Sequence, residues 1–376
     1  MPGDTGENIG ENIGENIVTL DDIRDARERL AGTIRETPLE RSFNLSRMLG
    51  RPIAFKPEYR QRTGSFKVRG AANFISRLAP GTEVVAASAG NHAQGVALAA
   101  TEAGLHATIF MPLTAPVPKV QATQDYGGTV RLVGDVFDQA NAAGQEYAAE
   151  RGAVFVPPFD NPLVIAGQGT IGLELAEQAP EAEVIIVPVG GGGLLAGVAA
   201  ALAQVESSGP RPHVIGVEPA GAASMTASLV AGRCVTLDRV ATMADGIAVK
   251  NCSDLTLAHA QEFVDDMVTV AEDDISRAVV LLLERAKAVV EPAGAVGLAA
   301  LLAGKIGGDG LAVPILSGGN VDPFLMLRLI DRGLSASGRF LVLRVIMNDR
   351  PGELARLSTR VSAMGLNILA VEHHRS

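Results

Sequence analysis

The sequence contains no tryptophan and only two cysteines, Cys234 and Cys252, among its 376 residues. One disulfide is the most that it can form, so a reducing compartment suits the chain, and we expect a cytoplasmic protein. Its beginning lacks a basic stretch that leads into an apolar one, which argues against a signal peptide. Its longest apolar runs, such as residues 194–205, are shorter than the roughly 20 residues that cross a bilayer, so we expect no membrane span.

Basic residues are also scarce relative to acidic ones. The chain has 32 lysines and arginines against 42 acidic residues, which gives a net charge of −10. Affinity for nucleic acids depends on lysine and arginine, so we expect no nucleic-acid partner. The six histidines include no pair at the spacing of metal ligands on a helix, which argues against a zinc site.

The first residues form a polar repeat. Residues 6–17 are three copies of Gly-Glu-Asn-Ile, with one apolar residue in four, so we expect a disordered tail over residues 1–17. The folded part is predicted to open with a helix that ends at Leu30, because the segment 19–22 offers N-cap residues.

After this helix, short apolar strands alternate with helices. Repeated strand, turn and helix units are typical of parallel sheets with helices on both faces, so we expect an α/β fold. The strands are predicted at residues 84–87, 107–111, 184–187, 214–217 and 313–316. Ligands of such folds bind at the carboxyl ends of the strands. Three polar or glycine-rich segments follow predicted strands there: residues 88–92, 190–193 and 317–320.

Lys67 is one of only six lysines and lies in the segment Thr63-Gly-Ser-Phe-Lys-Val-Arg-Gly70. A lysine taken alone is more often a solvated surface residue. A lysine that forms a Schiff base with an aldehyde needs a lowered pKa, and burial beside Phe66 would lower it.

Gly190, Gly191, Gly192 and Gly193 follow an apolar strand and precede a predicted helix. Unhindered backbone N–H groups and a helix N-terminus make such a turn an anion site. A tight structural turn is one alternative. A nucleotide-dependent oxidoreductase is another, because Gly191-x-Gly193-x-x-Ala196 with Glu218 after the next strand fits the relaxed dinucleotide fingerprint.

Ser317, in the segment 317–320, favours a different cofactor. By residue preference alone it is a helix N-cap. Beside the glycine-rich turn, however, its hydroxyl suits the ring nitrogen of a pyridine, which would stay unprotonated next to a neutral partner. A nicotinamide cofactor has no use for Lys67, so the combination predicts pyridoxal 5′-phosphate.

Ser88, Ala89, Gly90, Asn91 and His92 stand at another junction of strand and helix. Their donors suit the carboxylate of a small amino-acid substrate. For His92, an interior histidine with satisfied hydrogen bonds is an equal alternative.

At this point the chain resembles the fold-type II pyridoxal-phosphate enzymes, and among them the threonine dehydratase and serine racemase branch. The resemblance covers about residues 20 to 333. It rests on seven segments in order: Ser65-Phe-Lys-Val-Arg-Gly-Ala71, Ser88-Ala-Gly-Asn-His-Ala-Gln-Gly95, Ile165-Ala-Gly-Gln-Gly-Thr170, Gly190 to Leu194, Ala244-Asp-Gly-Ile-Ala248, Glu291-Pro-Ala-Gly294 and Ser317-Gly-Gly-Asn320.

The resemblance implies a role for each matching residue. Lys67 looks like the Schiff-base lysine, Phe66 like a residue that packs against the ring, and Asn91 like the partner of the ring's 3-oxygen. Ser317 resembles the ring-nitrogen partner and Gly246 the glycine on the other face of the ring. Gly190 to Gly193 with Leu194 look like the phosphate loop.

Departures from the family pattern discriminate within the branch. Ala89 stands where serine racemases carry a catalytic serine, so racemisation is disfavoured. At position 159 the chain has a phenylalanine, as dehydratases do, whereas racemases have an asparagine. Glu218 and the Ala222 carbonyl match the family's cation site, but Ser224 replaces an acidic ligand. We therefore expect a monovalent cation or none.

The resemblance also implies the domain organisation. It gives two open parallel-sheet α/β domains with the cofactor in the cleft between them: a large one over residues 18–82 and 153–333, and a small one over residues 83–152. A linker is expected at residues 334–338. Residues 339–376 resemble the first half of an ACT domain, with strands at 340–347 and 365–371 around a helix at 353–364.

The function that the resemblance implies is an L-threonine ammonia-lyase that forms 2-oxobutyrate and ammonia and also acts on L-serine. A serine racemase and a 3-hydroxyaspartate dehydratase of the same branch are alternatives. A non-catalytic amino-acid sensor is more remote, and the nucleotide-dependent oxidoreductase ranks lowest. By resemblance we expect a homodimer or homotetramer. An amino-acid effector, whether isoleucine or valine, and the absence of any effector are alternatives that the sequence leaves open.

Overall fold

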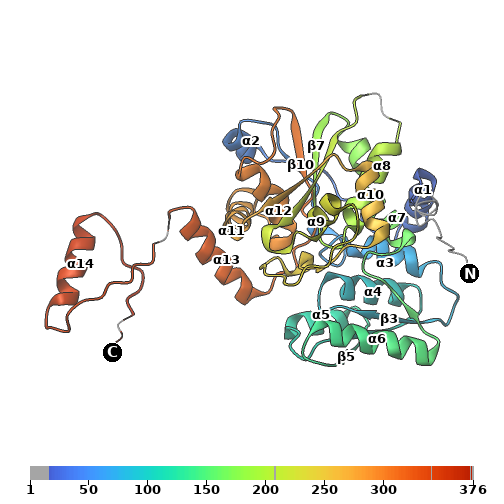
Figure 1. Cartoon of the computed structure of the whole chain (residues 1–376), viewed down its shortest axis with the longest axis horizontal. Helices are drawn as coiled ribbons and strands as arrows, with labels where there is room; N and C mark the ends of the chain where they lie inside the picture. The colour runs from blue at the N-terminus through green and yellow to red at the C-terminus, as the bar shows by residue number, and fades with distance from the viewer. Residues whose placement is uncertain (1–16, 207–208, 340, 373, 375–376) are drawn as a thin grey trace, which may run out of the picture.

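The computed structural model describes residues 17–206, 209–339, 341–372 and 374. The expected disordered tail lies outside the described residues except for Ile17. The chain forms two separate four-stranded sheets. The sheet with the shorter strands, which contains β3 (Glu83–Ala87) and β5 (Thr129–Leu132), is called the smaller sheet, and Figure 1 shows it below the other, larger sheet. The expected α/β class with two parallel-sheet domains is confirmed.

The larger sheet has the strand order β10-β7-β8-β9, and all its neighbours are parallel. Its strands are β7 (Ala182–Pro188), β8 (His213–Pro219), β9 (Asp266–Val270) and β10 (Leu311–Pro314). Ile53 and Lys56 form parallel bridges to Ala312 and Ile315, so the chain around β2 runs along the free edge of β10. A two-residue antiparallel pair joins β1 (Glu40–Arg41) to β2 (Ala54–Phe55).

The smaller sheet has the order β5-β4-β3-β6 and is also parallel. Its strands are β3 (Glu83–Ala87), β4 (His106–Met111), β5 (Thr129–Leu132) and β6 (Val154–Phe155). Because Val84 and Val85 pair with β6, this sheet includes residues beyond 152. The predicted boundary of the small domain at residue 152 is therefore too early.

Helices cover both sheets (Figure 1). They are α1 (Leu20–Leu30), α2 (Phe43–Leu49), α3 (Lys67–Ile75), α4 (Asn91–Glu102), α5 (Val117–Asp125), α6 (Phe137–Arg151), α7 (Pro162–Gln178), α8 (Gly193–Gln204), α9 (Ser224–Ala231), α10 (Asp254–Phe263), α11 (Glu272–Leu281), α12 (Pro292–Leu302), α13 (Pro323–Ala336) and α14 (Glu353–Ala363). Short helical turns occur at Glu58–Arg60, Ala220–Ala222, Asp245–Ile247 (η4) and Leu282–Ala286. No helix of the described residues is both long and apolar enough to cross a membrane.

Local sequence explains several of these elements. Thr19 caps α1 in a capping box with Asp22, as the segment 19–22 predicts. The residues of α8 and α12 are mostly small and apolar, and both helices are buried along nearly their whole length. Such helices suit positions between a sheet and other helices rather than at the surface.

The C-terminal part differs most from the prediction. Residues 334–336 belong to α13 rather than to a linker, because Gly333 lies against α11: a Cβ on it would be 2.6 Å from the Ser276 carbonyl oxygen. The helix predicted at 353–364 is present as α14, but residues 341–347 and 365–371 form no strand. α14 buries none of its residues and stands apart from the sheets (Figure 1).

Candidate functional site

The segment that carries Lys67 lies beside the segment that carries Ser317. The Phe66 N–H donates to the Ser317 carbonyl oxygen over 3.1 Å, and the Gly319 N–H donates to the Gly64 carbonyl oxygen over 2.9 Å. Ser65 and Gly318 also form an antiparallel bridge. The end of β10 thus fixes the backbone immediately before α3.

Lys67 is the first residue of α3. Its Nζ donates to the Pro158 carbonyl oxygen over 2.8 Å and lies 5.2 Å from the centroid of the Phe66 ring. Burial lowers the pKa of the amine to about 8, while the nearby Glu291 carboxyl opposes that shift. The neutral amine, which a nucleophile or base requires, is therefore more accessible near physiological pH than in an ordinary lysine.

The four glycines form the turn between β7 and α8. Gly192 has a φ of +94°, which glycine adopts without strain, and it precedes the first residue of α8. Phe159 lies against the turn: a Cβ on Gly191 would be 2.3 Å from the Phe159 ring, so no side chain fits there. The first-turn N–H groups of α8 have no acceptor within the helix and, with the helix dipole, suit a phosphate.

Asn91 connects the two sheets through its amide. Its Nδ2 donates to Glu291 Oε1 over 2.6 Å, and its Oδ1 accepts from Asn320 Nδ2 over 2.8 Å. Asn91 begins α4, which follows β3 of the smaller sheet, whereas Glu291 precedes α12 and Asn320 follows β10 of the larger sheet. The predicted ring-oxygen partner thus belongs to the smaller part and is held by two residues of the larger part.

Glu291 was not predicted as a site residue from the sequence, where it belongs only to the matching segment Glu291-Pro-Ala-Gly294. It is buried, and burial raises the pKa of its carboxyl to about 7, with Asp245 adding to the rise and Asn91 opposing it. A Cβ on Gly318 would lie 2.4 Å from Glu291 Oε1, and one on Gly246 would lie 3.6 Å from it. An acidic residue directly before the apolar helix α12 was the available signal.

The segment 88–92 lies at the end of β3 as predicted. The Ser88 Oγ accepts the Gly90 N–H over 3.1 Å, and Ala89 is half-buried. His92 is buried with Nε2 at 3.0 Å from the Val156 carbonyl oxygen. Burial, together with the charge of Lys67, lowers the pKa of His92 to about 3. These contacts match the interior-histidine alternative.

The candidate cation site is organised around the start of α9. Glu218 accepts the Met225 N–H at 2.8 Å, the Thr226 N–H at 2.9 Å and the Thr226 hydroxyl at 2.6 Å. Ser224 Oγ is buried without a hydrogen-bond partner, and Ala222 ends a short helical turn. In the described part of the chain, no group of three or more His, Cys, Asp or Glu side chains could hold a metal ion.

Two further buried hydroxyls test whether the predicted cofactor fits. Thr63 Oγ1 and Ser65 Oγ have no hydrogen-bond partner, and both flank the backbone that contacts Ser317 and Gly319. A buried hydroxyl without a partner is costly, so these groups suit the polar atoms of a bound molecule. The glycine turn, Lys67 and these hydroxyls together fit pyridoxal 5′-phosphate.

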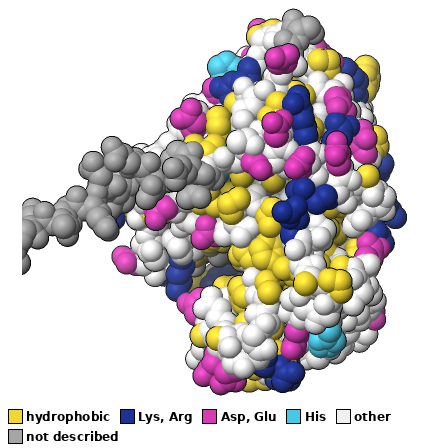
Figure 2. Space-filling view, turned by 90° about the vertical axis from the view of Figure 1, so that its right-hand side faces the viewer, with side chains coloured by type: hydrophobic (Ala, Val, Ile, Leu, Met, Phe, Trp, Pro, Cys, Tyr) yellow, Lys and Arg dark blue, Asp and Glu magenta, His cyan; other side chains and the backbone are white. Residues whose placement is uncertain are grey.

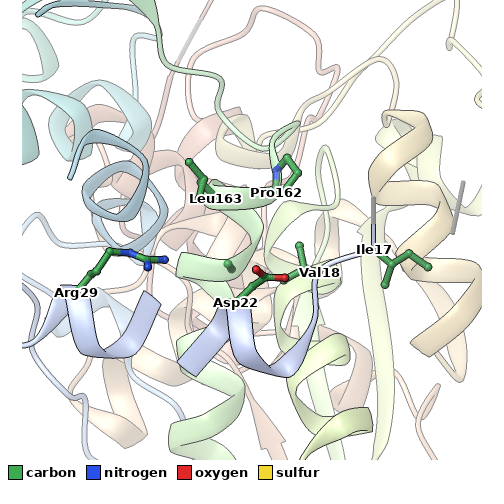
Figure 3. Close-up of a pocket in the computed structure, with 7 residues that line it drawn as sticks. Ile17, Val18, Asp22, Arg29, Pro162 and Leu163 are labelled. Carbon is green, nitrogen blue, oxygen red and sulfur yellow. The ribbon is translucent and has the colours of Figure 1, made fainter. Parts of the chain in front are cut away.

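The molecule has a hollow on its surface and, elsewhere, a cavity that lies apart from the candidate residues. Figure 2 shows apolar side chains gathered around a hollow between the larger upper part and the smaller lower part of the molecule. A cavity of about 140 Å³ occurs elsewhere, between α1 and the start of α7, where Asp22 and Arg29 approach Pro162 and Leu163 (Figure 3). None of the candidate residues lines it, so it is separate from the site.

Comparisons with known proteins agree with this geometry. The family model described as pyridoxal-phosphate dependent enzyme matches residues 30–318. The chain is 48% identical over 357 residues to an L-threonine ammonia-lyase of Geobacter sulfurreducens, a match that spans 94% of this chain and 88% of that protein.

Two solved structures extend the comparison. The processed form of threonine deaminase isoform 2 from Solanum lycopersicum has a TM-score of 0.78 at 40% identity, covering 88% of this chain and 95% of that one. Maize serine racemase has a TM-score of 0.78 at 37% identity, covering 86% and 99%. The chain therefore belongs to the fold-type II family of pyridoxal-phosphate-dependent enzymes.

Proposed function

We propose that this enzyme is an L-threonine ammonia-lyase that converts L-threonine to 2-oxobutyrate and ammonia and also accepts L-serine. The observation that carries the proposal is the Lys67 amine, whose pKa is lowered to about 8, on backbone that contacts the Ser317 segment. The similarity to the Geobacter sulfurreducens L-threonine ammonia-lyase supports the choice of substrate.

The proposed mechanism assigns the proton transfer to Lys67. Pyridoxal 5′-phosphate, when bound, supplies an electron-withdrawing ring that stabilises negative charge on the α-carbon of an amino acid. The neutral Lys67 amine takes the α-proton as general base. The β-hydroxyl then takes up a proton and leaves as water, which gives an enamine, and a second water hydrolyses the enamine to the 2-oxo acid and ammonia.

The remaining residues bind and orient. Gly190 to Gly193 and Leu194 would hold the phosphate through backbone N–H groups, and the Ser317 hydroxyl would face the ring nitrogen. Asn91 has a second Nδ2 hydrogen beyond the one given to Glu291, and this hydrogen would serve the ring oxygen. Phe66 and Gly246 would bound the two ring faces, and the segment 88–92 would receive the substrate carboxylate.

Serine racemase is the second candidate function, because maize serine racemase is a structural neighbour. Racemisation needs a proton donor on the face opposite to Lys67. The chain offers the methyl group of Ala89 where such enzymes carry a serine hydroxyl, so we place elimination first. A 3-hydroxyaspartate dehydratase differs only in the substrate side chain that it accepts.

Finer features belong to the same proposal. We infer a cytoplasmic homodimer or homotetramer with no nucleic-acid partner, and at most a monovalent cation near Glu218. The large part would comprise residues 18–82 and about 156–333, and the small part residues 83–155. Residues 341–372 would serve an amino-acid effector. A role in isoleucine biosynthesis draws support from a biosynthetic L-threonine dehydratase of Haemophilus influenzae, 42% identical over 329 residues.

The test measures visible absorbance of the purified protein before and after adding L-threonine, with 2-oxobutyrate followed in the same sample. We expect a cofactor band and product release, with both lost in Lys67→Ala. The exposed Lys305→Ala variant, as a matched control, should keep both. A band without product from L-threonine or L-serine would overturn the substrate assignment, and absence of a band would overturn the role of Lys67.

A further inference from the structure

Cys234 and Cys252, the only cysteines of the chain, lie side by side. Their sulfur atoms are 3.6 Å apart although 18 residues separate them in sequence. Both are free thiols. The two sulfurs need to come only about 1.5 Å closer to reach the length of a disulfide bond.

The surroundings of the two thiols differ. Cys252 is buried at 2% exposure, and its sulfur also contacts the Ser228 hydroxyl at 3.3 Å. Cys234 is half-buried and packs against the apolar cluster that contains Leu194 and Met225. A small oxidant therefore reaches Cys234 first, and Cys252 is placed to attack next.

The segment between the two cysteines forms one wall of the candidate site. It contains η4, and Ile247 and Val249 pack against Gly190 of the glycine-rich turn. Asp245 binds Lys119 of α5 over 2.6 Å, across the two parts of the molecule. A bond between the ends of this segment would restrict how far the wall moves away from the turn.

We propose that Cys234 and Cys252 are the site of a reversible intramolecular disulfide formed by exchange with a low-molecular-weight disulfide such as oxidised glutathione. The Cys234 thiolate attacks one sulfur of the oxidant, which forms a mixed disulfide and releases the first small thiol. The Cys252 thiolate then displaces the second small thiol. Two protein thiols are oxidised and one small disulfide is reduced to two thiols.

Burial raises the pKa of the Cys234 thiol, with Asp254 and Cys252 adding to the rise. The reactive thiolate is therefore scarce near neutral pH, and disulfide exchange is slow there. Exchange is consequently expected over hours rather than seconds in the folded protein.

The test incubates the full chain, with its cofactor, in excess oxidised glutathione at about pH 8.5, where more thiolate is present. After digestion, mass spectrometry should find a peptide pair linked through Cys234 and Cys252. The melting temperature should rise by several degrees, because closing a loop of this size restrains the unfolded chain. Dithiothreitol should reverse both changes.

Cys234→Ser and Cys252→Ser serve as matched controls. Each should give at most one glutathione adduct and no rise in melting temperature. In the linked wild type, backbone amides of residues 244–250 should exchange hydrogen more slowly than in the reduced protein. The proposal is overturned if the folded wild type gives only single adducts or dimers between chains, or if the linked form shows neither stabilisation nor slower exchange. None of these readouts depends on the reaction that the enzyme catalyses.

Discussion

Glu291 couples the candidate site to pH at the scale of a single residue. Its carboxyl has a pKa raised to about 7, whereas an ordinary glutamate titrates near 4.5. Between these values the folded protein binds a proton that the unfolded chain has released. The free energy of unfolding therefore falls as the pH rises through this interval, and the cost of the buried charge is fully present above pH 7.

Replacing Glu291 with glutamine should remove this dependence, because glutamine stays neutral. The free energy of unfolding of the wild type should fall from about pH 5 to pH 8, whereas that of Glu291→Gln should not. The difference between the two should therefore shift in favour of the variant by up to about 3 kcal/mol over this range. Urea unfolding at both pH values measures the change. Glu262→Gln, at an exposed position, controls for the substitution itself. An unchanged difference between Glu291→Gln and wild type at the two pH values would contradict the expectation.

The chemistry of individual residues was partly predictable from sequence. The four glycines and Ser317 follow strands, and parallel sheets bring such ends together, so their proximity follows from local patterns. Lys67 follows no strand, and it is the contact of its segment with the Ser317 segment that brings it there. Glu291 could not be found in this way, because its importance comes from contact with Asn91, 200 residues away. Burial of that kind leaves no periodic signal in the sequence.

At the scale of elements, α3 is fixed by ion pairs buried behind Lys67. Arg69, fully buried, donates to Glu58 Oε2 at 2.8 Å and to Glu174 Oε2 at 3.0 Å. Lys56 donates to the same Glu174 carboxylate at 2.5 Å and to the Thr37 carbonyl oxygen at 2.6 Å. These contacts join α3, α7 and the edge of the larger sheet, and they hold the helix on which Lys67 begins.

Arg69→Met should be strongly destabilising, because it leaves two buried carboxylates with a single cation. We expect a loss of about 3–5 kcal/mol in the free energy of unfolding. Arg27→Met is the control, since Arg27 pairs with Glu177 at the exposed surface and should cost less than about 1 kcal/mol. Denaturant unfolding of both variants checks this. Similar losses in the two variants would contradict the role assigned to the buried network.

Elements were predicted well where pattern and packing agree. The capping box of α1 and the strands β3, β4, β7 and β8 follow local signals. The linker predicted at 334–338 begins too early, because residues 334–336 still belong to α13, and the reason is that a glycine can serve two purposes. Gly333 is required by the close approach of α13 to α11, not by a turn. A glycine needed for helix contact and one needed for a turn look the same in a sequence.

At the scale of the whole molecule, the C-terminal segment contributes little to the folded body. Its apolar side chains are exposed, Ile346 at 97% and Val342 at 75%, and α14 buries none of its residues. We expect deletion of residues 341–376 to change the melting temperature of the enzyme by no more than about one or two degrees. Differential scanning calorimetry checks this, and a fall of many degrees would show that the segment stabilises the rest.

The contact between the Lys67 and Ser317 segments also bears on how the enzyme matures. Two hydrogen bonds and one bridge join stretches that are about 250 residues apart in the chain. During synthesis, which adds roughly 5–20 residues per second, Lys67 leaves the ribosome well before its partner exists. The site is therefore assembled only after residue 320 has emerged, and a nascent chain halted earlier would carry the lysine without a place to bind the cofactor.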